Sequence, residues 1–395
     1  MSNNIKKASW HFILLFGIIS MFGDITYEGG RSIASPYLAI LGASAAVVGL
    51  VSGLGEFVGY AFRLLSGYVA AKTKSYWAIS FIGYGLLVSI PLLALANNWQ
   101  LAAFFVVMER FGKAVRSPAK DTMLSFATSN TGRGFGFAVH EFIDQIGGII
   151  GPLLFSAVFF LHGTYKQGFT LLWIPAILTL VFLFTAKIKV PNPEALEEHH
   201  VEEQNTSSPT KKLPAKFWWY MLFSFLSVLG FANFQLIAFH LKVNTIITDV
   251  QIPFFYAIAM GVDAVAALLV GKIYDKSGLK VLILLPLLSA PIAFLTFTYS
   301  FNLVLAGVVL WGIVMAIHET IMRAAIADMV ARNNRAFAYG IFNTAYGLAW
   351  FMGSAAIGWL YEISIGSILW FISCIQVLSV LSFLFLNKQL KKNAL

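Results

Sequence analysis

Charged side chains inside long apolar runs are the residues of this sequence that could do chemistry. Asp24, Glu28 and Arg31 are spaced four and three apart, which places them on one stripe of a helix beside Tyr27. Two carboxylates this close in a low-dielectric site cannot both ionise cheaply, so one of them can hold a proton near neutral pH. The alternative is that Arg31 neutralises Glu28 near the outer end of the helix and only Asp24 is buried.

A second group of charges lies at a similar depth in two later runs. Glu56 precedes Arg63 by two helical turns, and Glu109 and Arg110 are adjacent. An arginine between two carboxylates can release one of them by changing partner, which is a physical way to couple a proton to a substrate. The predicted proton-coupling residues are Asp24, Glu28, Glu56, Glu109, Asp263, His318 and Glu319.

Neutral polar groups in the second part of the chain could bond a substrate. Asn233 and Gln235 occur in one apolar run, and Asn343 and Tyr346 occur in another. His318 could accept a proton near neutral pH or could equally bond a neighbouring helix. The predicted substrate-binding residues are Tyr27, Arg31, Arg110, Asn233, Gln235, Asn343 and Tyr346.

A further cluster of charges, with cations such as Lys113 and Arg116 in the run 100–125 and His140, Glu141 and Asp144 in the run 133–161, has two interpretations. The cluster could form a salt-bridge network between the two runs, which we favour, or it could contact a substrate directly. The string His140-Glu141-Phe-Ile-Asp144 also suggests a zinc hydrolase, but Asp144 replaces the second histidine and no third ligand is evident. We therefore expect no metal, and a charge network of Arg63, Lys113, Arg116, His140, Glu141, Asp144 and Arg323.

The composition shows what kind of element must hold these charges. The chain has 395 residues, of which 58% are apolar and 11% are charged, and this excludes a soluble enzyme. A membrane-spanning helix needs about 20 apolar residues, so the length fits twelve spans with short connections. We predict spans near 10–30, 44–71, 76–96, 100–125, 133–161, 168–186, 217–241, 250–273, 280–298, 302–329, 335–361 and 364–387.

The distribution of basic residues predicts the orientation. Most Lys and Arg residues fall on the connections that share a side with both termini, whereas the opposite side has Lys166, with Arg31 and Lys242 at its edges. The positive-inside rule then places both termini in the cytoplasm, and the net charge of +9 reflects this placement and not nucleic-acid binding. We expect a multi-pass protein of the cell (inner) membrane, in which the first apolar run is a membrane helix and not a signal peptide that is cleaved off.

One long polar stretch divides the predicted spans six and six. It contains four prolines, an acidic run and the pair His199 and His200, and it reads as a flexible cytoplasmic tether. The predicted organisation is a six-helix bundle over 1–186, a linker over 187–216 and a second six-helix bundle over 217–395.

The two predicted bundles repeat each other. Placing 63–76 over 267–280 aligns Gly67 with Gly271, and a shift of 202 residues aligns Gly151 with Gly353. Two helical bundles related by a repeat are the architecture of many secondary transporters, with the substrate site between them.

The loop after the second span of the second bundle reads Gly271-Lys-Ile-Tyr-Asp275-Lys276-Ser-Gly278-Leu-Lys280, whereas the first bundle has Ala71 in place of the Asp. This loop resembles the signature Gly-x-x-x-Asp-Arg-x-Gly-x-Arg/Lys of the major facilitator superfamily. The resemblance implies an all-α major facilitator fold of twelve helices. It also implies a conformational latch at Gly271, Asp275, Lys276, Gly278 and Lys280.

The resemblance and the buried charges together predict a secondary transporter, not an enzyme. Gly147, Gly148 and Gly151 partly resemble a segment of the antiporter branch, which favours proton-coupled export, although close helix packing explains these glycines equally well. An importer of a polar metabolite or chelate, and a membrane sensor of the same fold, are the alternatives. We expect a monomer in a lipid bilayer that binds a small molecule and protons, with no cofactor and no nucleic acid.

Overall fold

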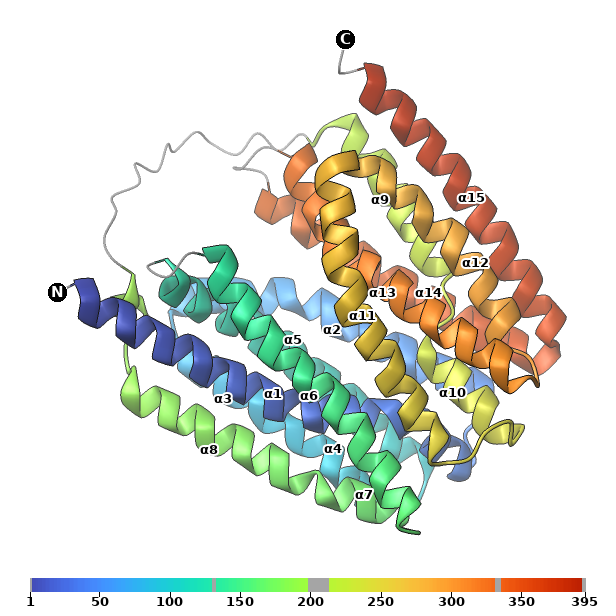
Figure 1. Cartoon of the computed structure of the whole chain (residues 1–395), viewed down its shortest axis with the longest axis horizontal. Helices are drawn as coiled ribbons and strands as arrows, with labels where there is room; N and C mark the ends of the chain where they lie inside the picture. Colours follow the sequence, from blue (N-terminus) through green and yellow to red (C-terminus); the bar gives the residue numbers. More distant parts are fainter. Residues whose placement is uncertain (1, 130–132, 198–212, 331–334, 393–395) are drawn as a thin grey trace.

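The computed structural model is helical throughout its described residues, which are 2–129, 133–197, 213–330 and 335–392. Two groups of helices pack side by side, and Figure 1 shows α1 to α8 in one group and α9 to α15 in the other. We call the side of the molecule that holds the connection 41–44 the distal side, and the opposite side the terminal side. The two groups confirm the predicted fold class of paired helical bundles.

Six crossings of the molecule form the first bundle. Its third crossing runs from α3 through η2, and its sixth combines α7 and α8. The bounds are α1 Ser2–Ile40, α2 Ala45–Thr73, α3 Tyr76–Gly85, η1 Leu86–Val88, α4 Ser89–Leu92, η2 Leu93–Leu95, α5 Trp99–Thr128, α6 Arg133–Phe160, α7 Tyr165–Leu171 and α8 Trp173–Lys189.

The second bundle also makes six crossings. Its first crossing combines α9 and α10, and its third combines η4 and α12. The bounds are α9 Ala215–Leu229, α10 Phe234–Val243, α11 Gln251–Ser277, η4 Gly278–Ile283, α12 Leu284–Thr296, α13 Phe301–Met329, α14 Arg335–Ile363 and α15 Ile365–Lys392.

Nine stretches of the described chain are long and apolar enough to cross a membrane. One of them, with 46 residues, contains both α11 and α12 and therefore two crossings. α5 is not among the nine because its charges, including Glu109, Arg110 and Lys113, interrupt every long apolar window. α14 is also absent from the nine, so hydropathy misses two crossings, and one of these, α5, carries many of the candidate functional residues.

The sequence repeat corresponds to a repeated helix contact. Gly151 in α6 touches α1 so closely that a Cβ atom there would lie 2.6 Å from the carbonyl oxygen of Ile25. Gly353 in α14 makes the equivalent contact, and its Cβ would lie 3.1 Å from the Cα of Leu229 in α9. The fifth crossing of each bundle therefore packs against the first crossing of the same bundle through an aligned glycine.

The charge-poor helices present apolar side chains outward. Ile177 on α8, Phe294 on α12 and Trp370 on α15 are 52%, 52% and 75% exposed. A soluble protein rarely exposes such faces together, whereas lipid tails solvate them well. This pattern indicates that the sixth crossing of the first bundle and the third and sixth crossings of the second bundle face lipid.

The structure corrects the expected place of Arg31. The sequence placed Arg31 at the edge of a span that ended near residue 30, but α1 continues to Ile40 and includes Pro36. The residues after Arg31 that extend the helix are buried and apolar, among them Ile33 and Leu38, so their packing outweighs the hydrogen bond that proline removes. Arg31 is therefore an internal charge, and it needs partners.

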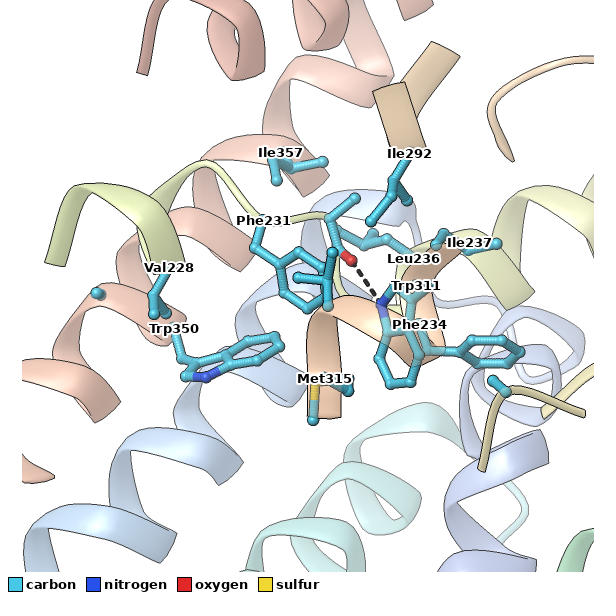
Figure 2. Packing of buried hydrophobic residues seen from close by; sticks show 14 of the residues in the cluster. Val228, Phe231, Phe234, Leu236, Ile237, Ile292, Trp311, Met315, Trp350 and Ile357 are labelled. Atoms are coloured by element: carbon cyan, nitrogen blue, oxygen red, sulfur yellow. Dashed lines mark hydrogen bonds between the residues drawn. The ribbon is translucent and has the colours of Figure 1, made fainter. Parts of the chain in front are cut away.

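The predicted continuous span 217–241 is broken in the structure. α9 ends at Leu229 and α10 begins at Phe234, where Asn233 caps the new helix by accepting a hydrogen bond from the backbone of Leu236. Figure 2 shows how Trp311 donates a hydrogen bond to the freed carbonyl of Ala232, at 3.0 Å. The freed backbone groups are satisfied inside the protein, which makes a break at membrane depth tolerable.

The polar stretch between the bundles is only partly described. Residues 198–212, including His199 and His200, lie outside the described part of the chain. Before them, α8 extends to Lys189 and a short 3-10 helix, Pro193–Leu196, packs Pro193 and Leu196 into the first bundle. The stretch therefore begins as ordered structure, unlike the flexible tether that its composition predicted.

Hydrogen bonds close the distal side by joining the two bundles. The hydroxyl of Tyr165 on α7 donates to Asp249 at 2.9 Å, and Lys242 on α10 binds the same carboxylate at 2.6 Å. Nearby, the hydroxyl of Ser156 on α6 donates to the carbonyl of Val250 at 2.9 Å. Asp249 thus holds groups from both bundles.

Replacing Gly151 should destabilise the protein. Gly151→Ala forces α1 and α6 apart, so we expect the free energy of unfolding to fall by about 1–3 kcal/mol. The measurement is the apparent unfolding temperature of the purified protein in detergent. Gly261→Ala is the matched control, because nothing lies within 4 Å of its new Cβ. Equal unfolding temperatures for the two variants would contradict this packing.

Removing the charge of Asp249 should loosen the distal side. Asp249→Asn removes the ion pair with Lys242 and weakens the bond from Tyr165, so the bundles lose a shared partner. We expect longer distances between spin labels placed at the exposed residues Leu161 and Ile363, after Cys374→Ser removes the native thiol.

Lys166→Gln is the control for this experiment. Lys166 lies on the same side of the molecule, but its bond to Asn97 stays within the first bundle. An unchanged distance distribution in Asp249→Asn, or an equal change in Lys166→Gln, would refute a role of Asp249 in closure.

Candidate functional site

The buried charges of α1, α2 and α5 converge on one place in the first bundle. Close packing makes this possible, because Gly55 on α2 lies against the side chain of Arg110, where a Cβ would be 3.0 Å from the Arg110 Cγ. Glu56 then points between α1 and α5. Three sequence segments that are far apart in the chain thus contribute to a single charged cluster.

Glu56 is the centre of this cluster. Its Oε1 atom accepts a hydrogen bond from Arg31 at 3.0 Å and another from Arg110 on α5. The side chains of all three residues are at most 14% exposed. A single carboxylate oxygen therefore balances two buried guanidinium groups, and removing it would leave two uncompensated charges.

The aromatic ring of Tyr27 makes cation–π contacts with the positively charged side chains of the cluster. The guanidinium carbon of Arg110 lies 4.7 Å from the ring centroid, and the Nζ atom of Lys113 lies 4.1 Å from it. Arg31 is 5.8 Å away and also donates a hydrogen bond to the Tyr27 hydroxyl at 3.0 Å. A buried aromatic face stabilises such cations without using their N–H donors.

Glu28 links the cluster to the second bundle. Its Oε2 atom accepts a hydrogen bond of 2.6 Å from the hydroxyl of Tyr256 on α11, and its Oε1 atom lies 3.8 Å from Arg31. Arg31 thus lies between two carboxylates, closer to Glu56 than to Glu28. A shift of about an ångström would reverse this preference, as the sequence hypothesis of a partner exchange requires.

A small cavity of about 30 Å³ lies beside the two arginines. Gln235 on α10 contributes to its wall from the second bundle, and Ser52 contributes from α2. This volume holds a water molecule or two but no organic molecule. The lining residues include Tyr27, Gly30, Arg31, Ser52, Glu56, Glu109, Arg110 and Gln235.

The charges toward the terminal side are arranged differently from the expected network. Arg116 bonds Glu109 of its own helix at 3.2 Å, and among the described residues no direct ion pair joins α5 to α6. His140 instead bonds the hydroxyl of Ser20 on α1 at 2.9 Å, and Oδ1 of Asp144 has no described partner. The direct hydrogen bonds and ion pairs of these residues therefore run within α5 and to α1. Lys113, Arg116 and Lys120 of α5 act on Asp144 of α6 only through longer-range electrostatic interaction, and the expected network stays a prediction.

His140, Glu141 and Asp144 bring their ligand atoms within 4.8 Å of one another, which is close enough for a shared metal ion. However, Lys113, Arg116 and Lys120 on α5 act electrostatically on the Asp144 carboxylate, and their positive charge opposes a cation there. Because one of the three ligands is exposed and another lies in the field of these cations, this group carries no metal assignment.

The candidates of the second bundle do not join the cluster. Asp263 on α11 is 3% exposed, and no side chain of the described residues donates a hydrogen bond to it. His318 on α13 contacts the sulfur of Met322 at 3.0 Å, and its ring packs edge-on with the ring of Tyr346 on α14. Glu319 on α13 is exposed, Asn343 on α14 is half-buried, and the side chain of Arg323 lies outside the described residues.

Asn233 has a role in joining the bundles. Besides capping α10, its amide nitrogen donates to Ser52 on α2 at 3.2 Å and to Ser354 on α14 at 2.6 Å. The break in the helix after Leu229 thus brings a polar side chain to the boundary of the two bundles. Discontinuous helices mark the substrate region in several transporter folds.

The loop that was expected to act as a latch contains a turn that favours glycine. Gly278 adopts a φ of +59°, which favours glycine, and it ends α11. Asp275 is exposed, and the neighbouring Tyr274 donates a hydrogen bond of 2.5 Å to Asp328 on α13. The latch of Gly271, Asp275, Lys276, Gly278 and Lys280 stays a prediction.

Sequence reasoning missed Tyr256 as a partner of the cluster. Aromatic residues are 15% of the chain, so their positions alone do not single out one that reaches a charge. The only available signal was that Tyr256 shares a span with Asp263, seven residues before it. That spacing places both on one face of α11, and this face meets the first bundle.

Comparison with known proteins supports the predicted resemblance. The model of the Major Facilitator Superfamily matches residues 14–290 and 221–394. An uncharacterised protein of Mycobacterium tuberculosis is 41% identical over 376 residues, which cover 94% of this chain and 92% of that protein. An uncharacterised MFS-type transporter of Methanocaldococcus jannaschii is 26% identical over 386 residues, covering 95% and 94%.

Solved structures share the fold at low sequence identity. A single-residue variant of the nucleoside transporter NupG superposes with a TM-score of 0.76 at 14% identity, covering 95% of this chain and 99% of that one. A bacterial homologue of the human lysosomal transporter Spinster, in an inward-facing and unoccupied conformation, gives 0.70 at 15% identity, covering 96% and 95%. The chain therefore belongs to the major facilitator superfamily, and it is a multi-pass membrane transporter and not an enzyme.

Proposed function

We propose that this protein is a proton-coupled transporter of a small organic molecule, which binds at the cluster of Arg31, Glu56 and Arg110. The observation that supports this most is that two buried arginines share one carboxylate oxygen beside a cavity at the boundary of the bundles. Charges at membrane depth are costly, and they mark substrate or proton pathways. Alternating access would open this cavity toward each side in turn.

The coupling follows from competition for the arginines. A substrate that accepts hydrogen bonds from Arg31 or Arg110 detaches Glu56, whose ionised form then lies buried without a cation. Such a carboxylate takes up a proton, because burial penalises its charge. Substrate and proton then bind together, and the loaded site can change sides without an unbalanced buried charge.

This coupling favours uptake of substrate with protons over the export that the sequence favoured. The glycines behind the export hypothesis pack against α1, since a Cβ at Gly151 would meet the backbone of Ile25 and Gly29. Their presence therefore has a packing cause. Export in exchange for protons stays the second proposal, and it requires that substrate and proton compete for one carboxylate.

The protein is proposed to lie in the cell (inner) membrane with both termini facing the cytoplasm. In that orientation the distal side, closed by Asp249 and its partners, is the outside. The positive-inside distribution of Lys and Arg supports this orientation. The protein would then work as a monomer, because one chain supplies both bundles and the cavity between them.

The substrate and direction can be found by untargeted mass spectrometry of cells and medium. Cells lacking their own related carriers are compared with and without this protein, using Arg110→Gln as the inactive control. We expect at least one compound to be depleted from the medium and enriched in the cells. Enrichment in the medium would establish export, and identical profiles across varied media would contradict transport and favour a sensor.

Neutralising Glu56 should separate binding from coupling. In Glu56→Gln proteoliposomes we expect accumulation driven by a proton gradient to fall at least about tenfold, because the side chain no longer takes up a proton. Exchange of labelled for unlabelled substrate should persist. Asp121→Asn, an exposed carboxylate on α5, is the control. Undiminished accumulation in Glu56→Gln would remove Glu56 from the coupling mechanism.

A further inference from the structure

The arginines of the cluster have more hydrogen-bond donors than the protein satisfies. Each guanidinium group carries five N–H donors. Among the described residues Arg110 bonds only Glu56, and Arg31 bonds Tyr27 and Glu56 while its buried Nε has no acceptor. Unused donors of two converging guanidinium groups beside a cavity are the feature that remains unexplained.

The charges around the cavity are balanced while Glu56 is ionised. Arg31, Arg110 and Arg116 pair with Glu28, Glu56 and Glu109. Lys113 lies over the Tyr27 ring, and Asp24 is the carboxylate that acts on it most. When a substrate detaches Glu56 and this side chain takes up a proton, one positive charge of the arginines is left uncompensated, and such a desolvated site favours an anion.

We infer that the transported substrate is an organic acid, whose carboxylate binds both Arg31 and Arg110 in the place that Glu56 now occupies. Glu56 is then an internal stand-in for the substrate: it has the same functional group and accepts from both arginines through one oxygen. Two guanidinium groups suit a planar anion with two acceptor oxygens. An amine would face two guanidinium groups and would gain only the carboxylates that already hold them.

This inference rests on the proposed function and explains its stoichiometry. A carboxylate that enters with one proton on Glu56 adds no net charge to the site, so one acid and one proton cross together. Such transport is electroneutral. Its rate should therefore not change when a potassium gradient with valinomycin imposes a membrane potential, because such a potential drives only an unbalanced charge.

The test uses the purified full-length protein and a library of small carboxylic acids, each with its matched primary amide and primary amine. Ligand binding raises the apparent unfolding temperature. We expect acids, and not their amides or amines, to stabilise the wild type. The shift should disappear in Arg31→Gln and Arg110→Gln and persist in Lys166→Gln, which alters an exposed cation of the first bundle.

Glu56→Gln provides a readout that a merely structural residue would not give. Removing the internal competitor frees both arginines, so acids should bind about tenfold more tightly, by the worth of one charge-assisted hydrogen bond. If Arg110→Gln does not fold, the double variant Arg110→Gln with Glu56→Gln removes both partners of a pair and serves instead. Acids should not stabilise that variant.

The outcomes separate the substrate class from the proposed function. If amines or neutral compounds stabilise the wild type and no acid does, and if this stabilisation is lost in Glu56→Gln, the substrate is not an organic acid. The proposal of transport at this site would then remain intact. Acid binding that is equal in wild type, Arg31→Gln and Arg110→Gln would overturn the site itself. Failure of every acid in the library to stabilise the wild type would also overturn the inference.

Discussion

Burying charge inside a membrane protein is the constraint on which the rest of this structure depends. An arginine in a low-dielectric interior needs a carboxylate partner, and here one oxygen of Glu56 serves Arg31 and Arg110 together. Glycines permit this approach: Gly55 admits the Arg110 side chain, and Gly151 lets α6 lie against α1. The Tyr27 ring adds cation–π contacts with Arg110 and Lys113.

The same cluster connects chemistry to movement of the bundles. Glu28 accepts a hydrogen bond from Tyr256 of the second bundle and lies 3.8 Å from Arg31, so it contacts both the arginine and the opposite bundle. Asn233, at the break between α9 and α10, ties Ser52 to Ser354 near the same boundary. In the proposed mechanism a change of partner at Glu56 disturbs these contacts between the bundles, so that local binding shifts a global equilibrium.

Much of the fold could be predicted from the sequence because the signals are strong. Long apolar runs require helices, and the aligned glycines Gly151 and Gly353 do the same work in each bundle. The positions of charged residues within the apolar runs also identified Glu28, Arg31, Glu56 and Arg110. Periodicity cannot tell which helix comes opposite a given face, so the pairing of Arg31 with Glu56 and of Glu28 with Tyr256 needed the structure. The break after Leu229 was missed because its flanking residues are as apolar as those of a continuous helix.

The central claim is that substrate displaces Glu56 from its arginines and a proton then binds with the substrate. The most direct measurement is the change in pH of a weakly buffered solution of the purified protein when a transported compound, titrated beforehand to the same pH, is added. The account predicts proton uptake of about one per molecule bound in the wild type, and none in Glu56→Gln. Proton release in the wild type, or an equal signal in Glu56→Gln, would contradict it.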